Sequence, residues 1–283
     1  VSGSGGVLGV LIPPSNPLIV YGVITSASIG DLFIAGIVPG LLMSFLMMGT
    51  VFLISQVRGY AGGNAFHVRA LAVSIWNGKY SLMMPVIVLG GIYTGMVTPV
   101  EAAVVAVLYA LVVAMLVKRT LTFRGLWDCF TESSTVCGGL TIIMGTAVFF
   151  GEYMTMNMIP QSLAAFIIEF VSSKYTLLII ICIFLLIIGT FMETLATTMI
   201  LTPILLPVIT TFDIDVIQFG VIMVVTNAIG MLTPPLGLNL FVACNLTGLS
   251  LEQVSSQVIP FICALILGLA LIAFIPWLSL VLL

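Results

Sequence analysis

Charged residues are scarce in this chain. Only 6% of its 283 residues are Asp, Glu, Lys or Arg, 61% are hydrophobic, and the mean hydropathy is +1.34. These values exclude a soluble globular domain and a disordered chain. The long apolar runs suit membrane helices rather than the alternating strands of a barrel. We therefore predict an all-α polytopic membrane protein, with the lipid bilayer as its main surroundings.

Residues that commonly carry enzyme chemistry or bind metals are also few. His67 is the only histidine, and the five cysteines are scattered without a Cys-x-x-Cys pair. A histidine-based metal site and a His-dependent catalytic triad are therefore excluded. The chain has no basic run for nucleic acid and no Walker loop for ATP. We predict no catalytic residues, no organic cofactor and no nucleic-acid partner.

Two Gly-x-Leu-x-Pro-Pro segments, Gly9–Pro14 and Gly230–Pro235, interrupt long apolar runs. Proline lacks an amide hydrogen and its ring clashes with the preceding turn, so each pair ends a helix. Lipid offers no partner for the backbone groups that such a break frees, so protein, water or an ion must pair with them. Two discontinuous helices of this kind indicate the binding site of a secondary transporter.

We expect this sequence to be the carboxy-terminal part of one transporter domain, because Val1 begins in mid-element. The predicted segments are a broken helix (1–27), spans and interfacial connections (28–127), a span with a surface helix (128–174), a re-entrant hairpin (175–212), a second broken helix (213–248) and a last span (249–283). Within residues 28–157 we expect an interfacial stretch at 70–77 and spans at 31–57, 80–97, 99–117 and 135–157.

Three helix starts carry capping residues. Thr98-Pro99 followed by Glu101 is typical of a capping box, which gives Glu101 a structural role. Ser250 with Gln253 predicts a second capping box. Ser28 is predicted to cap the helix that follows it. These signals fix where helices begin, and they set Glu101 apart from residues that bind an ion.

The apolar run at 175–212 is too long for one upright helix, which needs about 20 residues. Two full spans are one alternative. Arms of about 15 residues favour the other, a re-entrant hairpin with its polar tip at 189–198. Glu193 is the only charged residue of this run. A carboxylate at that depth costs roughly 2.5–3.5 kcal/mol, so either it couples an ion or proton, or the tip opens into water.

The basic residues predict the orientation of the breaks. Six of the seven lie in the connections 58–79 and 118–127, which should both face the cytoplasm. Counting the crossings then makes the two broken helices antiparallel, provided that 175–212 is a hairpin. An offset of 221 residues also aligns Asp31 with Glu252 and Pro39 with Pro260. We therefore predict an inverted repeat.

Carbonyl and hydroxyl oxygens at the breaks can hold a cation without buried charge, so we predict two sodium sites. The candidate sodium-binding residues are Ser2, Ser4, Gly5, Gly9 and Pro13 at the first break, and Thr190, Glu193, Thr194, Thr226, Gly230, Thr233 and Pro234 at the second, where Asn227 is a further donor. The candidate substrate-binding residues are Ser15, Asn16, Thr198, Asn239 and Asn245. Each threonine could instead donate to a carbonyl of its own helix.

Several motifs resemble the large membrane (M) subunit of tripartite ATP-independent periplasmic (TRAP) transporters. They are Gly9–Ser15, Tyr21–Val23, Phe33–Gly40, Gly90–Ala103 and Ala228–Phe241. The resemblance implies a multi-pass protein of the bacterial or archaeal cytoplasmic membrane. It also implies sodium-driven, elevator-type import of an organic acid anion such as a carboxylate, C4-dicarboxylate or sugar acid. The implied partners are a periplasmic binding (P) protein and a small membrane (Q) subunit.

The resemblance places the sodium sites at Ser2–Pro13 and at Thr190–Thr194 with Gly230–Pro234. Sialic-acid members carry an arginine where this chain has Asn245, which argues against sialic acid as the substrate. Three alternatives remain beside this interpretation. They are a single-component dicarboxylate or citrate symporter, a membrane enzyme using Glu101 and Glu193, and a scaffold subunit that does not transport.

Overall fold

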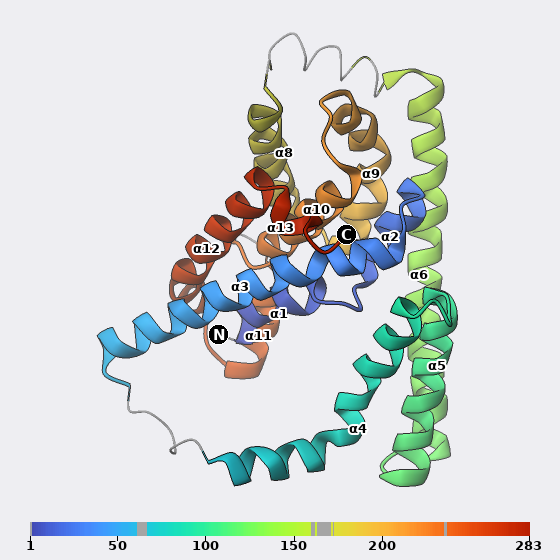
Figure 1. The fold of residues 1–283 in the computed structure, drawn as a ribbon, viewed down its shortest axis with the longest axis vertical. Coiled ribbons are helices and arrows are strands. Elements are labelled where there is room, and N and C mark those ends of the chain that lie inside the picture. Colours follow the sequence, from blue (N-terminus) through green and yellow to red (C-terminus); the bar gives the residue numbers. More distant parts are fainter. Residues whose placement is uncertain (1, 61–66, 160–161, 163–170, 172, 235–236) are drawn as a thin grey trace. The chain divides into compact units, whose positions relative to one another are not determined.

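The computed structural model describes residues 2–60, 67–159, 162, 171, 173–234 and 237–283 (Figure 1). Within these residues all regular elements are helical, and six helices are long and apolar enough to cross a membrane. The chain is thus an all-α polytopic membrane protein, as predicted. The helices are α1 (Ser2–Leu11), α2 (Asn16–Thr25), α3 (Ile29–Arg58), α4 (Val68–Tyr93), α5 (Pro99–Leu111), the π-helix η1 (Val112–Val117), α6 (Phe123–Met156), α8 (Lys174–Gly189), α9 (Thr194–Thr211), α10 (Val216–Gly230), α11 (Leu238–Thr247), α12 (Leu251–Phe274) and α13 (Trp277–Leu280).

The chain divides into two compact units. The smaller unit comprises residues 55–141 and is built around a contact between α4 and α5. The Tyr109 hydroxyl donates to the Tyr80 carbonyl at 2.8 Å and joins these two helices. The capping box at Thr98 is confirmed: the Thr98 N–H donates to Glu101 Oε2 at 2.7 Å, and the Glu101 N–H donates to Thr98 Oγ1 at 3.3 Å. Glu101 therefore has the structural role that its position predicted.

Two predicted boundaries differ from the structure. The expected interfacial stretch at 70–77 and the expected span at 80–97 form one helix, α4, which continues through Pro85. The end of the expected connection at 118–127 and the expected span at 135–157 likewise belong to the single 34-residue α6. Local polarity lowered the hydropathy of these stretches without supplying a residue that ends a helix. The predicted surface helix at 159–172 lies mostly outside the described residues.

The larger unit comprises residues 1–54 and 142–283 and is centred on α10. Every residue from Gln218 to Gly230 is buried. Helices α1, α2, α8, α9, α12 and α13 all contact α10. A helix that is apolar on nearly all faces is typical of such a buried position or of a membrane span. The first half of the second broken helix, α10, therefore forms the centre of this unit.

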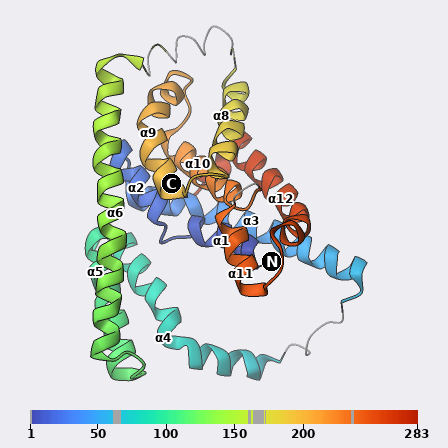
Figure 2. The same ribbon diagram turned by 180° about the vertical axis from the view of Figure 1, so that it is seen from behind.

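The run at 175–212 forms two helices, α8 and α9, joined by residues 190–193. The arms have 16 and 18 residues, and both contact α10 (Figures 1 and 2). Short arms and a short polar connection agree with the predicted hairpin. The joint falls at the only charged residue of the run, Glu193, because a polar residue there can cap the second arm.

The two broken helices lie antiparallel, as predicted. Near the end of the first, the Tyr21 hydroxyl donates to the Val216 carbonyl at the start of α10, at 2.8 Å. At the other end, a Cβ atom on Gly3 would lie 3.5 Å from the Asn239 carbonyl oxygen of α11. The start of each broken helix therefore lies beside the end of the other, which is the relation expected of inverted repeats.

The repeat extends beyond the breaks. Helices α2 and α11 both have ten residues, and both end at a left-handed residue, Ser26 (φ 57°) and Gly248 (φ 70°). The long helices that follow, α3 and α12, contain Pro39 and Pro260 at the aligned position. The capping box at Ser250 is confirmed, and the Ser28 hydroxyl accepts from the Asp31 N–H at 3.2 Å. Each of the two helices that follow the first break thus has a counterpart at the aligned position after the second break.

The Tyr21 bond gives a test of this pairing. Tyr21 is fully buried, so Tyr21→Phe should leave the Val216 carbonyl with one partner fewer and lower the free energy of unfolding by about 1 kcal/mol. Thermal unfolding of the purified protein in detergent measures this change. Tyr153→Phe, at an exposed position of α6, is the matched control. Equal midpoints for Tyr21→Phe and the wild type would contradict a stabilising bond between α2 and α10.

Candidate ion and substrate site

Each Pro-Pro break frees carbonyl groups at the end of a helix. In an α-helix the carbonyl of residue i accepts from the N–H of residue i+4. Pro13 and Pro234 have no N–H, so the carbonyls of Gly9 and Gly230 lose their usual partners. The Gly230 carbonyl instead accepts from the Thr233 N–H at 2.8 Å, in a tighter turn. Both carbonyls lie at the negative end of a helix dipole, which favours a cation.

The next carbonyl along each break finds a partner from further down the chain. The Ser15 hydroxyl donates to the Val10 carbonyl at 2.5 Å, and the Asn239 N–H donates to the Met231 carbonyl at 3.1 Å. Ser15 also accepts from the Leu18 N–H as the N-cap of α2. The structure thus gives Ser15 a role in closing the first break, beside its predicted contact with substrate.

The hairpin tip lies directly against the second break. A Cβ atom on Gly230 would lie 2.7 Å from the Cα and carbonyl carbon of Gly189, so only glycine permits this approach. The Gly237 N–H donates to the Thr190 carbonyl at 3.3 Å, and the Thr194 hydroxyl donates to Met231 Sδ at 3.0 Å. The tip and the break, distant in sequence, therefore form one site.

The threonines of this site mostly donate to their own helices. Thr190, Thr226 and Thr233 donate to carbonyls three or four residues earlier, at 2.6–2.9 Å. Thr198, a predicted substrate ligand, is fully buried and donates to the Thr194 carbonyl at 2.7 Å. The structure therefore shows the alternative stated for these threonines, in which each donates to a carbonyl of its own helix. A hydroxyl that donates to a carbonyl still has lone pairs for a cation, so the two roles are compatible.

Glu193 has a role that the sequence analysis did not consider. It is the N-cap of α9, and its Oε2 accepts from the N–H groups of Leu195 and Ala196 at 3.0 and 3.3 Å. The positive end of the α9 dipole favours the carboxylate there. The position of Glu193 directly before a threonine-rich helix was the sequence signal that could have predicted this capping role. The carboxylate stabilises the tip whether or not it also meets an ion.

The first break supplies fewer groups within the described residues. Ser4 is fully buried, and its hydroxyl has no hydrogen-bond partner among them. Cβ atoms on Gly5 and Gly9 would meet nothing within 4 Å, so a ligand can approach this face of α1 closely. Pro13 is buried, and Asn16 is exposed at the start of α2. The side chain of Ser2 lies outside the described part of the structure.

Asn239 connects the two broken helices. A Cβ atom on Gly6 of α1 would lie 3.0 Å from Asn239 Nδ2. The Asn239 side chain therefore packs against α1 at the start of α11, where the helix dipole is positive and favours an anion. Asn245 belongs to α11, but its side chain lies outside the described part. Pro234 is exposed at the second break.

Asn227 is the least satisfied polar residue of the site. It is fully buried, and neither Oδ1 nor Nδ2 has a partner among the described residues. Its backbone lies against Gly189, whose Cβ atom would be 3.0 Å from the Asn227 carbonyl oxygen. Sequence reasoning named it only as a further donor, although it is the one asparagine of α10.

These donors suit a hard monovalent cation. Carbonyl, hydroxyl and amide oxygens surround the tip and the break, and Glu193 contributes the one carboxylate. No group of three His, Cys, Asp or Glu side chains in the described part could hold a transition metal. Oxygen ligands with little charge fit sodium better than zinc or copper.

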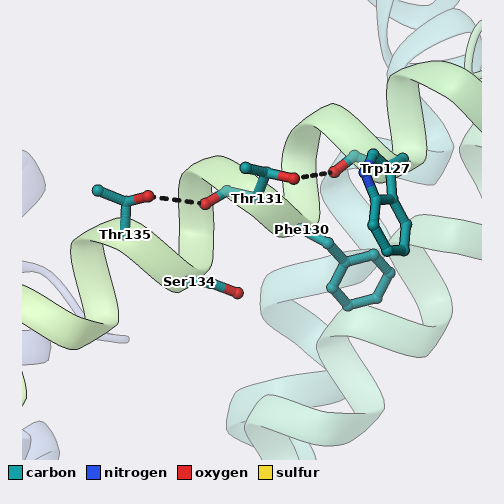
Figure 3. A pocket seen from close by; sticks show the side chains of 5 residues that line it. All are labelled: Trp127, Phe130, Thr131, Ser134 and Thr135. Carbon is teal, nitrogen blue, oxygen red and sulfur yellow. Dashed lines mark hydrogen bonds between the residues drawn. The ribbon is translucent and has the colours of Figure 1, made fainter.

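A concave region lies on α6 in the smaller unit. It has a volume of about 420 Å³ and is lined by Trp127, Phe130, Thr131, Ser134 and Thr135. Figure 3 shows these side chains along one helix, where Thr131 donates to the Trp127 carbonyl and Thr135 to the Thr131 carbonyl. It is open, and none of its lining residues is charged. The oxygen-rich site at the tip is therefore the better candidate.

Comparison with known proteins identifies the family of this chain. The family model "Tripartite ATP-independent periplasmic transporter, DctM component" matches residues 1–278. This chain belongs to the DctM family. It is 42% identical to the isethionate TRAP transporter permease protein DctMQ of Oleidesulfovibrio alaskensis over 96% of this chain and 43% of that protein. It is 38% identical to the C4-dicarboxylate TRAP transporter large permease protein DctM of Pseudomonas aeruginosa over 99% of this chain and 65% of that protein.

A third relative is the 2,3-diketo-L-gulonate TRAP transporter large permease protein YiaN of Escherichia coli, at 33% identity over 96% of this chain and 64% of that protein. The chain thus spans between two fifths and two thirds of the length of these relatives. The family confirms the resemblance stated from the motifs. It is a family of transporter permeases, which agrees with a multi-pass membrane protein.

The glycine contact predicts a steric effect. Gly230→Ala should push the tip from the break and lower the free energy of unfolding by roughly 1–3 kcal/mol, because the added carbon meets backbone atoms. Thermal unfolding in detergent is the measurement. Gly49→Ala, where a Cβ atom meets nothing within 4 Å, should be neutral or slightly stabilising. Similar midpoints for the two variants would mean that the tip does not lie against Gly230.

Proposed function

We propose that the DctM-family protein containing this chain imports a small organic acid anion across the bacterial inner membrane, driven by a sodium gradient. The contact between the hairpin tip and the Pro-Pro break carries this proposal. It gathers helix-end carbonyls, hydroxyls and a buried amide that has no partner among the described residues, at the ends of interrupted helices, where membrane transporters hold ions.

The helix ends supply opposite charges to cation and anion. Helices α1 and α10 end at the breaks and present negative dipole ends, which we assign to sodium. Helices α2 and α11 begin beside them and present positive ends, which we assign to the anionic group of the substrate, whereas the Glu193 carboxylate already caps the positive end of α9. No arginine lies near either break, so amides, hydroxyls and dipoles would hold the carboxylate or sulfonate.

The relatives' names indicate the substrate class and the partners. They name isethionate, C4-dicarboxylates and diketo-L-gulonate, which are all small organic acids. We infer that a periplasmic binding protein delivers such an acid and that a small membrane subunit supports the permease. The antiparallel broken helices further support an elevator motion, in which the tip and both breaks move together.

Uptake of a radiolabelled C4-dicarboxylate into proteoliposomes tests this proposal, using the complete permease with its small subunit and binding protein. Uptake should require an inward sodium gradient and should stop when choline replaces sodium. Uptake that continues with sodium absent from both sides would refute sodium coupling. Uptake that needs sodium but not the binding protein would instead indicate a single-component symporter.

Two threonine variants test the sodium site. Thr233→Ala and Thr194→Ala should each raise the sodium concentration for half-maximal uptake by roughly fivefold, if each removes an oxygen contact worth about 1 kcal/mol. Thr210→Ala is the control, because Thr210 also donates to carbonyls of α9 but is exposed at its far end. If both site variants match the control in their sodium dependence, the ion binds elsewhere.

A further inference from the structure

Asn227 stands out from the other polar residues around the hairpin tip. The buried threonines there all donate to a carbonyl or a sulfur, whereas both polar atoms of the Asn227 side chain lack a partner among the described residues. Native proteins pair nearly all buried polar side-chain atoms, because an unpaired amide loses its hydration without compensation. The retention of such a residue at a site of close packing requires a reason.

The hairpin packs against the backbone at Asn227. Gly189, at the end of α8, lies against the Asn227 backbone, and one turn further along α10 it also lies against Gly230. The Gly237 N–H and the Thr190 carbonyl hold the tip in this position. Moving the tip away would uncover this face of α10. The cost of the unpaired amide is therefore part of the cost of docking the tip.

We propose that Asn227 makes docking of the hairpin tip conditional on bound cargo, an inference that rests on the proposed transport function. Its Oδ1 can contact a cation, and its Nδ2 can donate to an anionic oxygen of the substrate. When neither is bound, docking buries an unpaired amide and is disfavoured. When cargo pairs with the amide, that penalty disappears. Asn227 thus disfavours a closed but unloaded carrier.

Hydrogen–deuterium exchange of the tip tests this inference without measuring transport. The complete transporter would be studied in lipid nanodiscs, first in choline chloride and then in sodium chloride. In choline, Asn227→Leu should slow exchange in the peptides that cover residues 189–198 and 230–240 by about tenfold relative to the wild type, because an apolar side chain of similar size removes the penalty. Adding sodium should slow exchange in the wild type and change the variant little.

Two further variants make the result decisive. Ser279→Ala removes another fully buried hydroxyl without a partner among the described residues, in α13, and should leave tip exchange at the wild-type rate in both salts. Asn227→Ala covers the case that leucine does not fit, and it should also slow tip exchange in choline. Faster or unchanged tip exchange in both Asn227 variants in choline would overturn the inference, since the amide would then stabilise the docked tip or be neutral.

The inference and the proposed function fail in different ways. If sodium does not slow tip exchange in the wild type, and uptake is independent of sodium, then the choice of coupling ion is wrong. Slower exchange of the Asn227 variants in choline would still support conditional docking under that outcome. If wild-type exchange responds to sodium but the Asn227 variants exchange like the wild type in choline, the proposed function stands and the role of Asn227 is refuted.

Discussion

A backbone group without a partner is costly in an apolar interior, and the larger unit of this protein is arranged around that cost. Each Pro-Pro pair removes two amide donors from the end of a helix. The freed carbonyls of Val10 and Met231 are paired by Ser15 and Asn239. The Gly230 carbonyl accepts from the Thr233 N–H, and it lies with the Gly9 carbonyl at the negative helix ends, where an oxygen lone pair can still face a cation. The breaks are therefore the places where this chain can interact with something other than itself.

The hairpin completes the second break because glycine allows two backbones to touch. Gly189 and Gly230 approach more closely than any residue with a Cβ atom permits. This contact brings Thr190, Thr194 and the cap at Glu193 to the end of α10. The same contact covers Asn227. Close packing and an unsatisfied polar group thus coincide at one point, which connects docking of the tip to whatever pairs with the amide.

Much of the fold follows from local rules that the sequence obeys. Pro-Pro pairs end helices, serine and threonine cap them, and the positions of Pro39 and Pro260 reveal the repeat. Polar residues alone predicted less well. Asn77 and Lys79 suggested a boundary inside α4, but neither ends a helix, and the helix continues. The role of Glu193 was also missed, because a carboxylate in an apolar run was compared only with an ion or water as its partner.

By itself, the sequence determined that the chain is a membrane protein with two interrupted helices, a hairpin and oxygen donors at the breaks, since composition and proline chemistry act locally. Tertiary structure alone decided which distant segments meet, and therefore that Asn227 is buried. Gly189 and Asn227 are far apart along the chain, and the backbone of one lies against that of the other. Ser15 and Glu193 cap their helices through partners within five residues, so local rules could have assigned those roles. The lack of a partner for Asn227 among the described residues emerged only from the fold, because burial depends on segments that are far apart in the sequence.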